Sequence, residues 1–234
     1  LAGGTFSAAI ANDGTYKHNS SANQTISGVI SGTGAVVKDN SSTLTLSGDN
    51  TYSGNTTVSA GTLALSHASL NNIISNSSII DVAGGATLDV SGLTSGFKLA
   101  NGQTLSGAGT VSGDMTIASG SVLSPGNSPG TLSTGSQTWN DGGTYLWEIN
   151  ASNDAGGTQG ADPGWDWLDI TGSLDLSSLT AGGFTIDIDS LTSGNIAGDA
   201  IGFDTWTKGS PGDVDYSFTI ATASSGITGF DADN

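Results

Sequence analysis

Apolar and polar residues alternate in short runs along this chain of 234 residues. In Thr43-Leu44-Thr45-Leu46, successive side chains of an extended strand point to opposite faces, so both leucines share one face and both threonines the other. Such runs recur about every eight residues over the first part of the chain, with Gly, Asn, Ser or Asp between them. The pattern predicts many short strands that each bury one face. The clearest are Thr25–Ile30, Thr43–Leu46, Thr62–Leu65, Ile79–Val82, Thr87–Val90, Thr104–Leu105, Thr110–Val111, Met115–Ile117 and Val122–Leu123.

Helix signals are nearly absent, because no window keeps apolar residues at helical spacing over several turns. Two all-β architectures remain, a sandwich or barrel of longer hairpin strands and a β-solenoid of short strands with tight corners. Internal repetition favours the solenoid: G-T-L at 61–63 returns as A-T-L at 86–88 and as G-T-L at 130–132. Three strands per coil predict roughly 20–25 residues per turn.

One stretch resembles a known family. Residues 30–38 read I-S-G-T-G-A-V-V-K, and residues 43–63 read T-L-T-L-S-G-D-N-T-Y-S-G-N-T-T-V-S-A-G-T-L. Together they are similar to the autotransporter-associated β-strand repeat, whose pattern is G-x-G, a Lys, T-L-x-L-x-G-x-N-x-Y-x-G, a Thr and G-x-L. The resemblance covers residues 28–66 and implies a right-handed parallel β-helix in large bacterial surface or secreted proteins.

Two details extend or qualify this resemblance. L-S-P-G-N-S-P-G-T-L at 123–132 is similar to a motif found near the C-terminal end of such repeat regions. After Lys38 the family usually has a turn that contains Gly, whereas this chain has Asp39-Asn40-Ser41-Ser42. Asn can adopt the left-handed backbone conformation, so we expect the turn to form here as well.

Composition changes near residue 137. All five tryptophans and 15 of the 21 acidic residues follow this point. Strands there look longer: Tyr145, Trp147 and Ile149 fall on one face of an expected strand. We therefore divide the chain into a β-helix repeat region, residues 1–137, and a Trp- and Asp-rich β region, residues 138–234. The second region is either an aromatic β-sandwich or, as we prefer, a cap continuous with the solenoid that closes its open end.

Charge and cysteine content exclude several classes of partner. Four lysines, no arginine and a net charge of −17 argue against nucleic acid and anionic membrane surfaces. No apolar run approaches the ~20 residues that span a bilayer. The chain has no cysteine, hence no disulfide or thiolate chemistry, which suits a secreted bacterial protein. It begins at Leu1 without an initiator Met, so we expect a processed product or a fragment.

Acidic residues are the candidates for chemistry. Asp162, Asp166 and Asp169 are the nearest approach to a carboxylate pair of a glycosidase. In a chain this rich in Asp such neighbours arise easily, so we predict no catalytic residues and no enzyme. Hard carboxylate oxygens suit calcium, and a structural calcium ion is the one cofactor considered. Its candidate ligands are Asp154, Asp162, Asp213 and Asp215, although we prefer the explanation that they are solvated acidic turns that keep the surface soluble.

Aromatic and histidine side chains give two further expectations. Trp165 and Trp167 flank Asp166 and are expected on one strand face, where they would stack on a glycan or form a packing or subunit contact. His18 and His67 are isolated from other metal-ligating residues and are expected at the surface.

The leading functional hypothesis is a non-enzymatic extracellular structural protein at the bacterial surface, either a stalk or a self-assembling fibre subunit. Its expected partners are further copies joined end to end, because a head-to-tail contact produces an open filament, or other surface proteins. The alternative is an adhesin that binds glycans through the Trp- and Asp-rich region. A polysaccharide-active enzyme is a third and weaker hypothesis.

Overall fold

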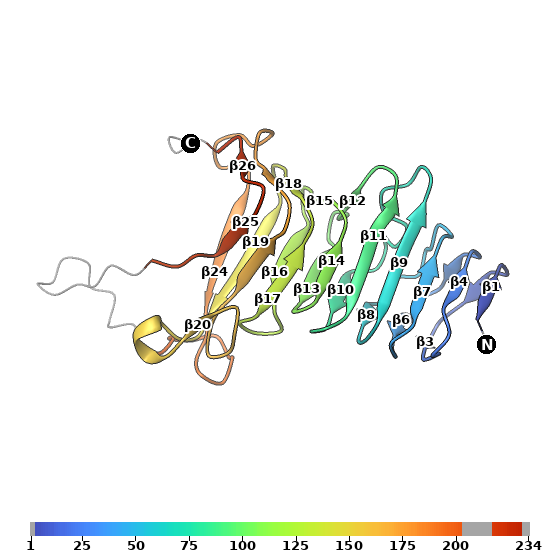
Figure 1. Cartoon of the computed structure of the whole chain (residues 1–234), viewed down its shortest axis with the longest axis horizontal. Coiled ribbons are helices and arrows are strands. Elements are labelled where there is room, and N and C mark those ends of the chain that lie inside the picture. The colour runs from blue at the N-terminus through green and yellow to red at the C-terminus, as the bar shows by residue number, and fades with distance from the viewer. Residues whose placement is uncertain (1–2, 203–216, 231–234) are drawn as a thin grey trace, which may run out of the picture.

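The computed structural model describes residues 3–202 and 217–230, and these residues form an all-β parallel β-helix (Figure 1). The chain winds from the N-terminal coil to the C-terminal coil, and strands pair in parallel with their counterparts one coil later. The exception among the described strands is the short strand β21 (Gly164–Trp165), which pairs antiparallel with β19 (Thr144–Ile149). The only helix among these residues is the short 3-10 helix η1 (Asn153–Ala155). In this part of the chain no helix has the length and apolarity needed to cross a membrane. The predicted solenoid is confirmed.

Three sheets run along the solenoid. Sheet 1 contains β1 (Gly4–Phe6), β4 (Gln24–Ile26), β7 (Thr43–Leu46), β9 (Thr62–His67), β11 (Thr87–Leu93), β14 (Thr110–Ser112), β17 (Thr131–Thr134), β22 (Trp167–Ile170) and β25 (Ala221–Ala223). Sheet 2 contains β3 (Thr15–His18), β6 (Ala35–Lys38), β8 (Thr56–Val58), β10 (Ile79–Val82), β13 (Thr104–Gly107), β16 (Val122–Pro125), β19 (Thr144–Ile149), β24 (Thr185–Ser190), β21 (Gly164–Trp165) and β20 (Thr158–Gln159).

Sheet 3 begins later in the chain and is shorter. It contains β12 (Phe97–Lys98), β15 (Met115–Ile117), β18 (Gln137–Trp139), β23 (Leu174–Asp175) and β26 (Ile227–Thr228). A two-stranded sheet of β2 (Ile10–Ala11) and β5 (Ile30–Ser31) belongs to the first coils. The expected strand Thr25–Ile30 is therefore wrong as a single element, because the chain turns at Ser27–Gly28 and contributes to two sheets.

Coil length follows from the register of sheet 1. Leu44 pairs with Leu63, 19 residues later, and Leu63 pairs with Leu88, 25 residues later, close to the expected period. The last coils are longer: Leu132 pairs with Leu168, 36 residues later, and Leu168 pairs with Ala221, 53 residues later. The additional residues loop out between strands, so the parallel pairing is kept.

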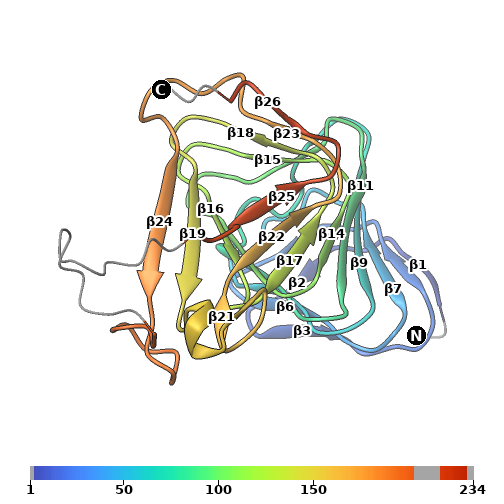
Figure 2. The same ribbon diagram turned by 60° about the vertical axis from the view of Figure 1, so that its left-hand side comes forward.

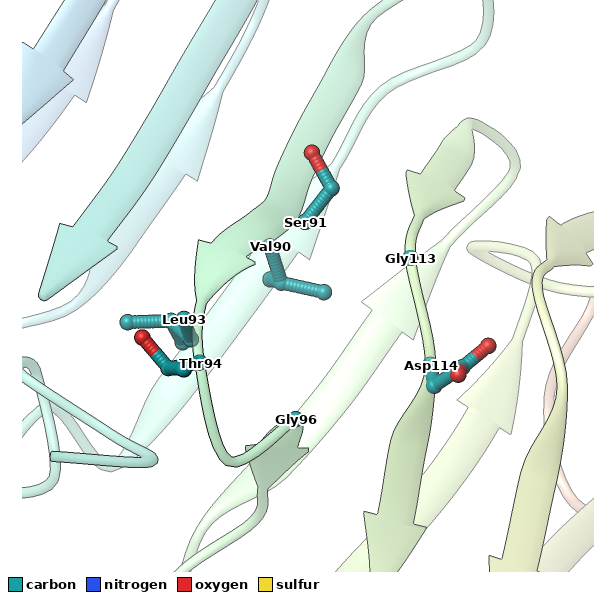
Figure 3. A pocket seen from close by; sticks show the side chains of 7 residues that line it. All are labelled: Val90, Ser91, Leu93, Thr94, Gly96, Gly113 and Asp114. Carbon is teal, nitrogen blue, oxygen red and sulfur yellow. The ribbon is translucent and has the colours of Figure 1, made fainter. Parts of the chain in front are cut away.

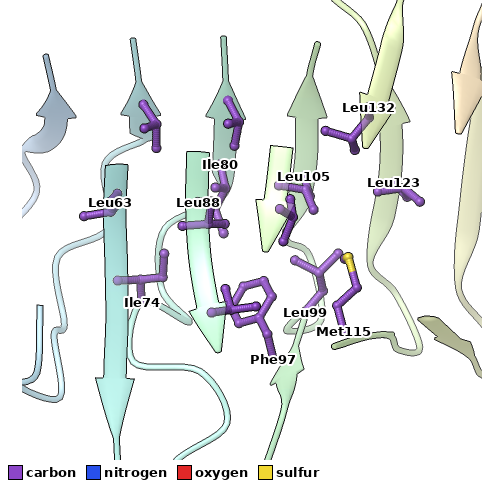
Figure 4. Close-up of a cluster of buried hydrophobic side chains, with 14 of the residues drawn as sticks. Leu63, Ile74, Ile80, Leu88, Phe97, Leu99, Leu105, Met115, Leu123 and Leu132 are labelled. Atoms are coloured by element: carbon purple, nitrogen blue, oxygen red, sulfur yellow. The ribbon is translucent and has the colours of Figure 1, made fainter. Parts of the chain in front are cut away.

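The core is a stack of inward-facing aliphatic side chains. Leu63 and Leu88 in sheet 1, and Leu105 and Leu123 in sheet 2, have no exposed surface and sit above one another from coil to coil (Figure 4). Period-two alternation creates this stack, because each strand turns every second residue inward. Each fully buried leucine contributes about 1.5–3 kcal/mol of transfer free energy. A chain with few charged residues therefore still has a continuous apolar core.

The three sheets continue past residue 137. β17 pairs with β22, β18 with β23 and β19 with β24, all in parallel. Seen from the turned view, the last strands β24, β25 and β26 each lie beside the preceding strand of their own sheet (Figure 2). Tyr145, Trp147 and Ile149 all point inward from β19, as predicted. The division at residues 137 and 138 stays a prediction about domains, but the Trp- and Asp-rich strands stack on the same solenoid.

Candidate functional site

Lys38 is the last residue of β6, and its side chain points into the wall, the layer of stacked strands that encloses the core. Its side chain has no exposed surface. The Nζ atom donates to the carbonyl oxygens of Asp39 at 2.9 Å, Asn40 at 2.7 Å and Ala60 at 3.0 Å. Burial lowers the pKa of Lys38, and the three charge-assisted hydrogen bonds offset part of the cost of burying the ammonium group. Asn40 has a φ of 68°, so the predicted left-handed turn is confirmed.

Asn50 connects the corner after β7 to the neighbouring coil. Its Nδ2 donates to the Gly48 carbonyl at 2.8 Å, and its Oδ1 accepts from the Ile30 N–H at 2.9 Å. The backbone approaches closely here, because a Cβ at Gly48 would lie 2.6 Å from the Gly28 carbonyl oxygen of the preceding coil. The Gly and Asn of the repeat pattern thus serve one contact between coils.

Tyr52 and two hydroxyl residues form a buried chain of hydrogen bonds. Tyr52 Oη lies 2.6 Å from Thr56 Oγ1, which lies 2.9 Å from Ser77 Oγ one coil later. All three side chains have no exposed surface. Burial raises the pKa of the Tyr52 phenol well above its usual range, so the phenol stays neutral and can donate. This polar chain links two coils inside the wall.

Comparison with known families agrees with this geometry. The Passenger-associated-transport-repeat family matches residues 36–65, a segment that includes Lys38, Asn50 and Tyr52. Residues 36–65 are a passenger-associated-transport repeat. The autotransporter-associated repeat expected from the sequence is confirmed over this segment. No curated protein and no solved structure matches the chain.

His18 lies directly before Lys38 in the same inward column of sheet 2, one coil earlier. Its side chain is only 3% exposed, so the expectation of a surface histidine was wrong. Neither ring nitrogen has a hydrogen-bond partner among the described residues. Burial and the charge of Lys38 lower the pKa of His18, which keeps the imidazole neutral. The segment that matches the family, residues 36–65, therefore packs against a preceding coil that contains a buried, neutral histidine.

Asp166 is a fully buried carboxyl group at the junction between β21 and β22. Its Oδ1 accepts from the Gly130 N–H at 2.8 Å, and its Oδ2 accepts from the Glu148 N–H at 2.9 Å. Trp147 Nε1 donates to the Asp166 carbonyl at 2.8 Å. Burial raises the pKa of Asp166 to about 8, although the two N–H donors oppose the shift. Asp166 thus holds the end of the S-P-G-N-S-P-G loop against the next coil.

Asp162 and Asp169 do not join Asp166 in a catalytic pair. Asp162 accepts from Asn150 Nδ2 at 2.7 Å and from Asn195 Nδ2 at 2.8 Å, and these hydrogen bonds lower its pKa. Asp169 points outward from sheet 1, with Ser133 Oγ at 3.4 Å. The three carboxyl groups therefore occupy three separate environments.

The calcium candidates are likewise dispersed. Asp154 is exposed in the 3-10 helix η1, and both oxygens of Asp162 are engaged by the two asparagines. Asp213 and Asp215 lie outside the described residues. Among residues 3–202 and 217–230, no three His, Asp or Glu side chains are grouped as a metal site requires. The structural calcium ion stays a prediction.

The two candidate tryptophans lie on different strands of different sheets, so the expected shared face was wrong. Trp165 ends β21 of sheet 2, is 5% exposed and packs edge-on against Phe218 at 4.9 Å between ring centroids. Trp167 begins β22 of sheet 1, faces outward, and donates from Nε1 to Thr222 Oγ1 at 3.1 Å. The chain changes sheets at Asp166, between them. Only Trp167 is placed to meet a ligand, and its glycan or subunit contact stays a prediction.

A hollow of about 240 Å³ lies where β11 ends and β14 continues toward sheet 3 (Figure 3). It is lined by Val90, Ser91, Leu93, Thr94, Gly96, Gly113 and Asp114. Asp114 is the only acid in this lining, and no base accompanies it. A single carboxylate without a base or a second acid does not form the constellation that acid–base catalysis requires.

We did not predict from the sequence that Lys38 and Asp166 are buried and hydrogen-bonded within the fold. For Lys38 the signal was present: Val36 faces inward, so alternation places Lys38 inward as well. For Asp166 no local signal exists, because its burial depends on Gly130, 36 residues earlier, and on Glu148, 18 residues earlier.

Proposed function

We propose that the chain is a non-enzymatic structural element of an exported or surface-displayed bacterial protein, acting as a β-solenoid spacer. The observation that carries this proposal is the direction of the repeat's polar residues. Lys38, Asn50 and Tyr52 all point into the wall and bond to groups of the chain itself. Side chains with these contacts stabilise the packing of the coils, and their polar atoms are not available to bind a ligand. The family match supports export, because the repeat is named for passenger transport.

A second candidate function is glycan binding at the C-terminal end, as in an adhesin. Trp167 is half-buried on the outer face of sheet 1, next to a polar row in which Ser133 and Thr222 approach Asp169 at 3.4 and 3.5 Å. An aromatic ring beside hydroxyl and carboxylate groups is a surface on which a sugar can stack and hydrogen-bond.

The test is a panel of polysaccharides and a glycan array, applied to the wild-type chain, to Trp167→Ala and to Ile79→Ala. Ile79 is 39% exposed on sheet 2 and serves as a matched apolar surface control. A spacer gives no turnover and the same background binding for all three proteins. Binding that Trp167→Ala removes and Ile79→Ala keeps would replace the spacer with the adhesin. Turnover that Asp169→Asn abolishes would show an enzyme.

A further inference from the structure

The two ends of sheet 2 present complementary strands. At the N-terminal end, β3 pairs with β6, and no other described strand pairs with β3. At the C-terminal end, β24 pairs with β19 and with no other described strand. An unpaired strand edge exposes a row of N–H and C=O groups that can accept another strand.

Register places the side chains of these two strands in common columns. Tyr16 of β3 and Ile186 of β24 are the first and last members of one inward column. The members between them are Val36, Thr56, Ile80, Leu105, Leu123 and Tyr145. Lys17 and Asp187, the next residue of each strand, therefore share an outward column. If the column continued into another molecule, Ile186 would meet Tyr16 and Asp187 would meet Lys17.

Exposure and charge at the C-terminal end fit this continuation. Ile186 is 46% exposed and Ile188 is 63% exposed, although their register partners in β19, Tyr145 and Trp147, are buried. Glu148 and Asp189 are direct neighbours in register, and burial together with the charge of Asp189 raises the pKa of Glu148. The end therefore carries uncovered apolar surface and crowded acids without a cation beside them in register. A strand that presents an apolar residue next to a lysine would cover the apolar surface and reduce the repulsion between the acids.

The N-terminal end presents such a strand. Lys17 is half exposed, and its Nζ contacts Asp39 Oδ2 of its own coil at 2.7 Å. One side of the ammonium group thus remains open for a second carboxylate. We infer that β24 of one molecule pairs in parallel with β3 of a second copy, with Lys17 placed between Asp39 and the Asp187–Asp189 pair. This contact rests on the proposed spacer function and specifies how spacers join.

The contact is heterologous, so it repeats without closing and predicts filaments. Three proteins test it by sedimentation velocity and electron microscopy across a range of concentrations: wild type, Lys17→Glu and the double variant Asp187→Lys/Asp189→Lys. Each variant alone places like charges at every junction. A mixture restores opposite charges at both kinds of junction, because each variant keeps one wild-type end. Lys98→Glu matches the net charge of Lys17→Glu, and Asp49→Lys/Asp114→Lys matches that of the double variant; these three control residues are exposed and lie away from the ends.

We expect wild type and both controls to form filaments, each end variant to sediment as a monomer, and the equimolar mixture to form filaments again. Recovery in the mixture also shows that both variants are folded. A wild type that stays monomeric at every concentration would overturn this contact and leave the spacer function intact. Filaments formed by either end variant alone, or a mixture that stays monomeric, would overturn it too. Specific turnover or glycan binding would overturn the spacer function whatever the state of association.

Discussion

At the scale of single residues, the wall of this β-helix contains polar groups that hold coils together. Lys38 and Asn50 each satisfy groups of a neighbouring coil, and Asp166 does the same near the C-terminal end. Tyr52 is linked to the next coil through Thr56, which bonds to Ser77. Alternation was a signal for the direction of Lys38 that we did not use, since a charged residue is rarely fully buried unless it is paired. Two of the bonds that allow its burial are to the following residues, Asp39 and Asn40, but the third is to Ala60, 22 residues later, which local sequence does not reveal.

Replacing Lys38 with methionine tests the first of these contacts. Methionine fills similar space but leaves the carbonyl groups of Asp39, Asn40 and Ala60 without their donor. We expect the free energy of unfolding to fall by about 2–3 kcal/mol in chemical denaturation. Lys98→Met, on an exposed side chain, is the control and should change stability by less than about 0.5 kcal/mol. Equal stability of the two variants would contradict the role of Lys38.

His18 gives the protein a predictable pH dependence. Its pKa is lowered in the folded chain, so the unfolded state binds the proton more strongly, and stability falls as the pH drops below the ordinary value of 6.5. Asp166 contributes the opposite slope, because its raised pKa favours the folded state as the pH falls below about 8. Comparison with His18→Leu isolates the histidine.

We expect His18→Leu to match or exceed wild type in stability near pH 8, and we expect its advantage over wild type to grow as the pH is lowered to 5. The measurement is urea unfolding at both values of pH. A difference between the two proteins that does not grow on acidification would show that His18 is not buried in its neutral form.

At the scale of elements, strands were predictable, whereas the sheet that the chain enters after a corner was not. Alternation predicts a strand at Leu44 and Leu46 and another at Leu63 and Leu65. The structure has a strand at both places, β7 and β9. The similar pentapeptides at 30–34 and 105–109 led to different places: the first precedes β6 of sheet 2 and the second precedes β14 of sheet 1. A Gly-x-Gly sequence specifies a turn, but which sheet the chain enters after the turn depends on packing against the preceding coil. The same reason explains the missed separation of Trp165 and Trp167.

Gly61 tests how tightly a corner is built. Its φ is 66°, and a Cβ there would lie 2.5 Å from the Ser42 carbonyl oxygen and 2.8 Å from Lys38 Nζ. Gly85 has a similar φ of 80° but open space around it, so Gly85→Ala measures the backbone cost alone, about 1 kcal/mol. We expect Gly61→Ala to destabilise the chain by about 3 kcal/mol, since a steric clash is added. Thermal unfolding of both variants is the measurement, and equal losses would contradict the packed corner.

At the scale of the whole molecule, the chain is a rod with two different ends. Nine strands of sheet 1 spaced by about 4.8 Å give a length of roughly 38 Å. Composition suggested a change of architecture near residue 137, since tryptophans and acids gather after it. The solenoid nevertheless continues, because the later strands keep period-two alternation and because the longer coils place their additional residues in loops. The sequence led us to prefer such a cap, but it could not locate strand partners that lie 36 and 53 positions apart in the chain.

The most direct test of this continuous wall is a pair of introduced cysteines, since the chain has none of its own. Ser133 and Asp169 are register partners on the outer face of sheet 1, one on each side of residue 137. Neighbouring strands of one sheet bring Cα atoms within disulfide range, so Ser133→Cys/Asp169→Cys should form a disulfide on mild oxidation of the folded chain. Thr110→Cys/Asp169→Cys spans two steps of the same sheet, about 10 Å, and should not. A continuous solenoid predicts efficient disulfide formation in the first variant alone; if the first pair forms no more disulfide than the second, the two regions do not share one wall.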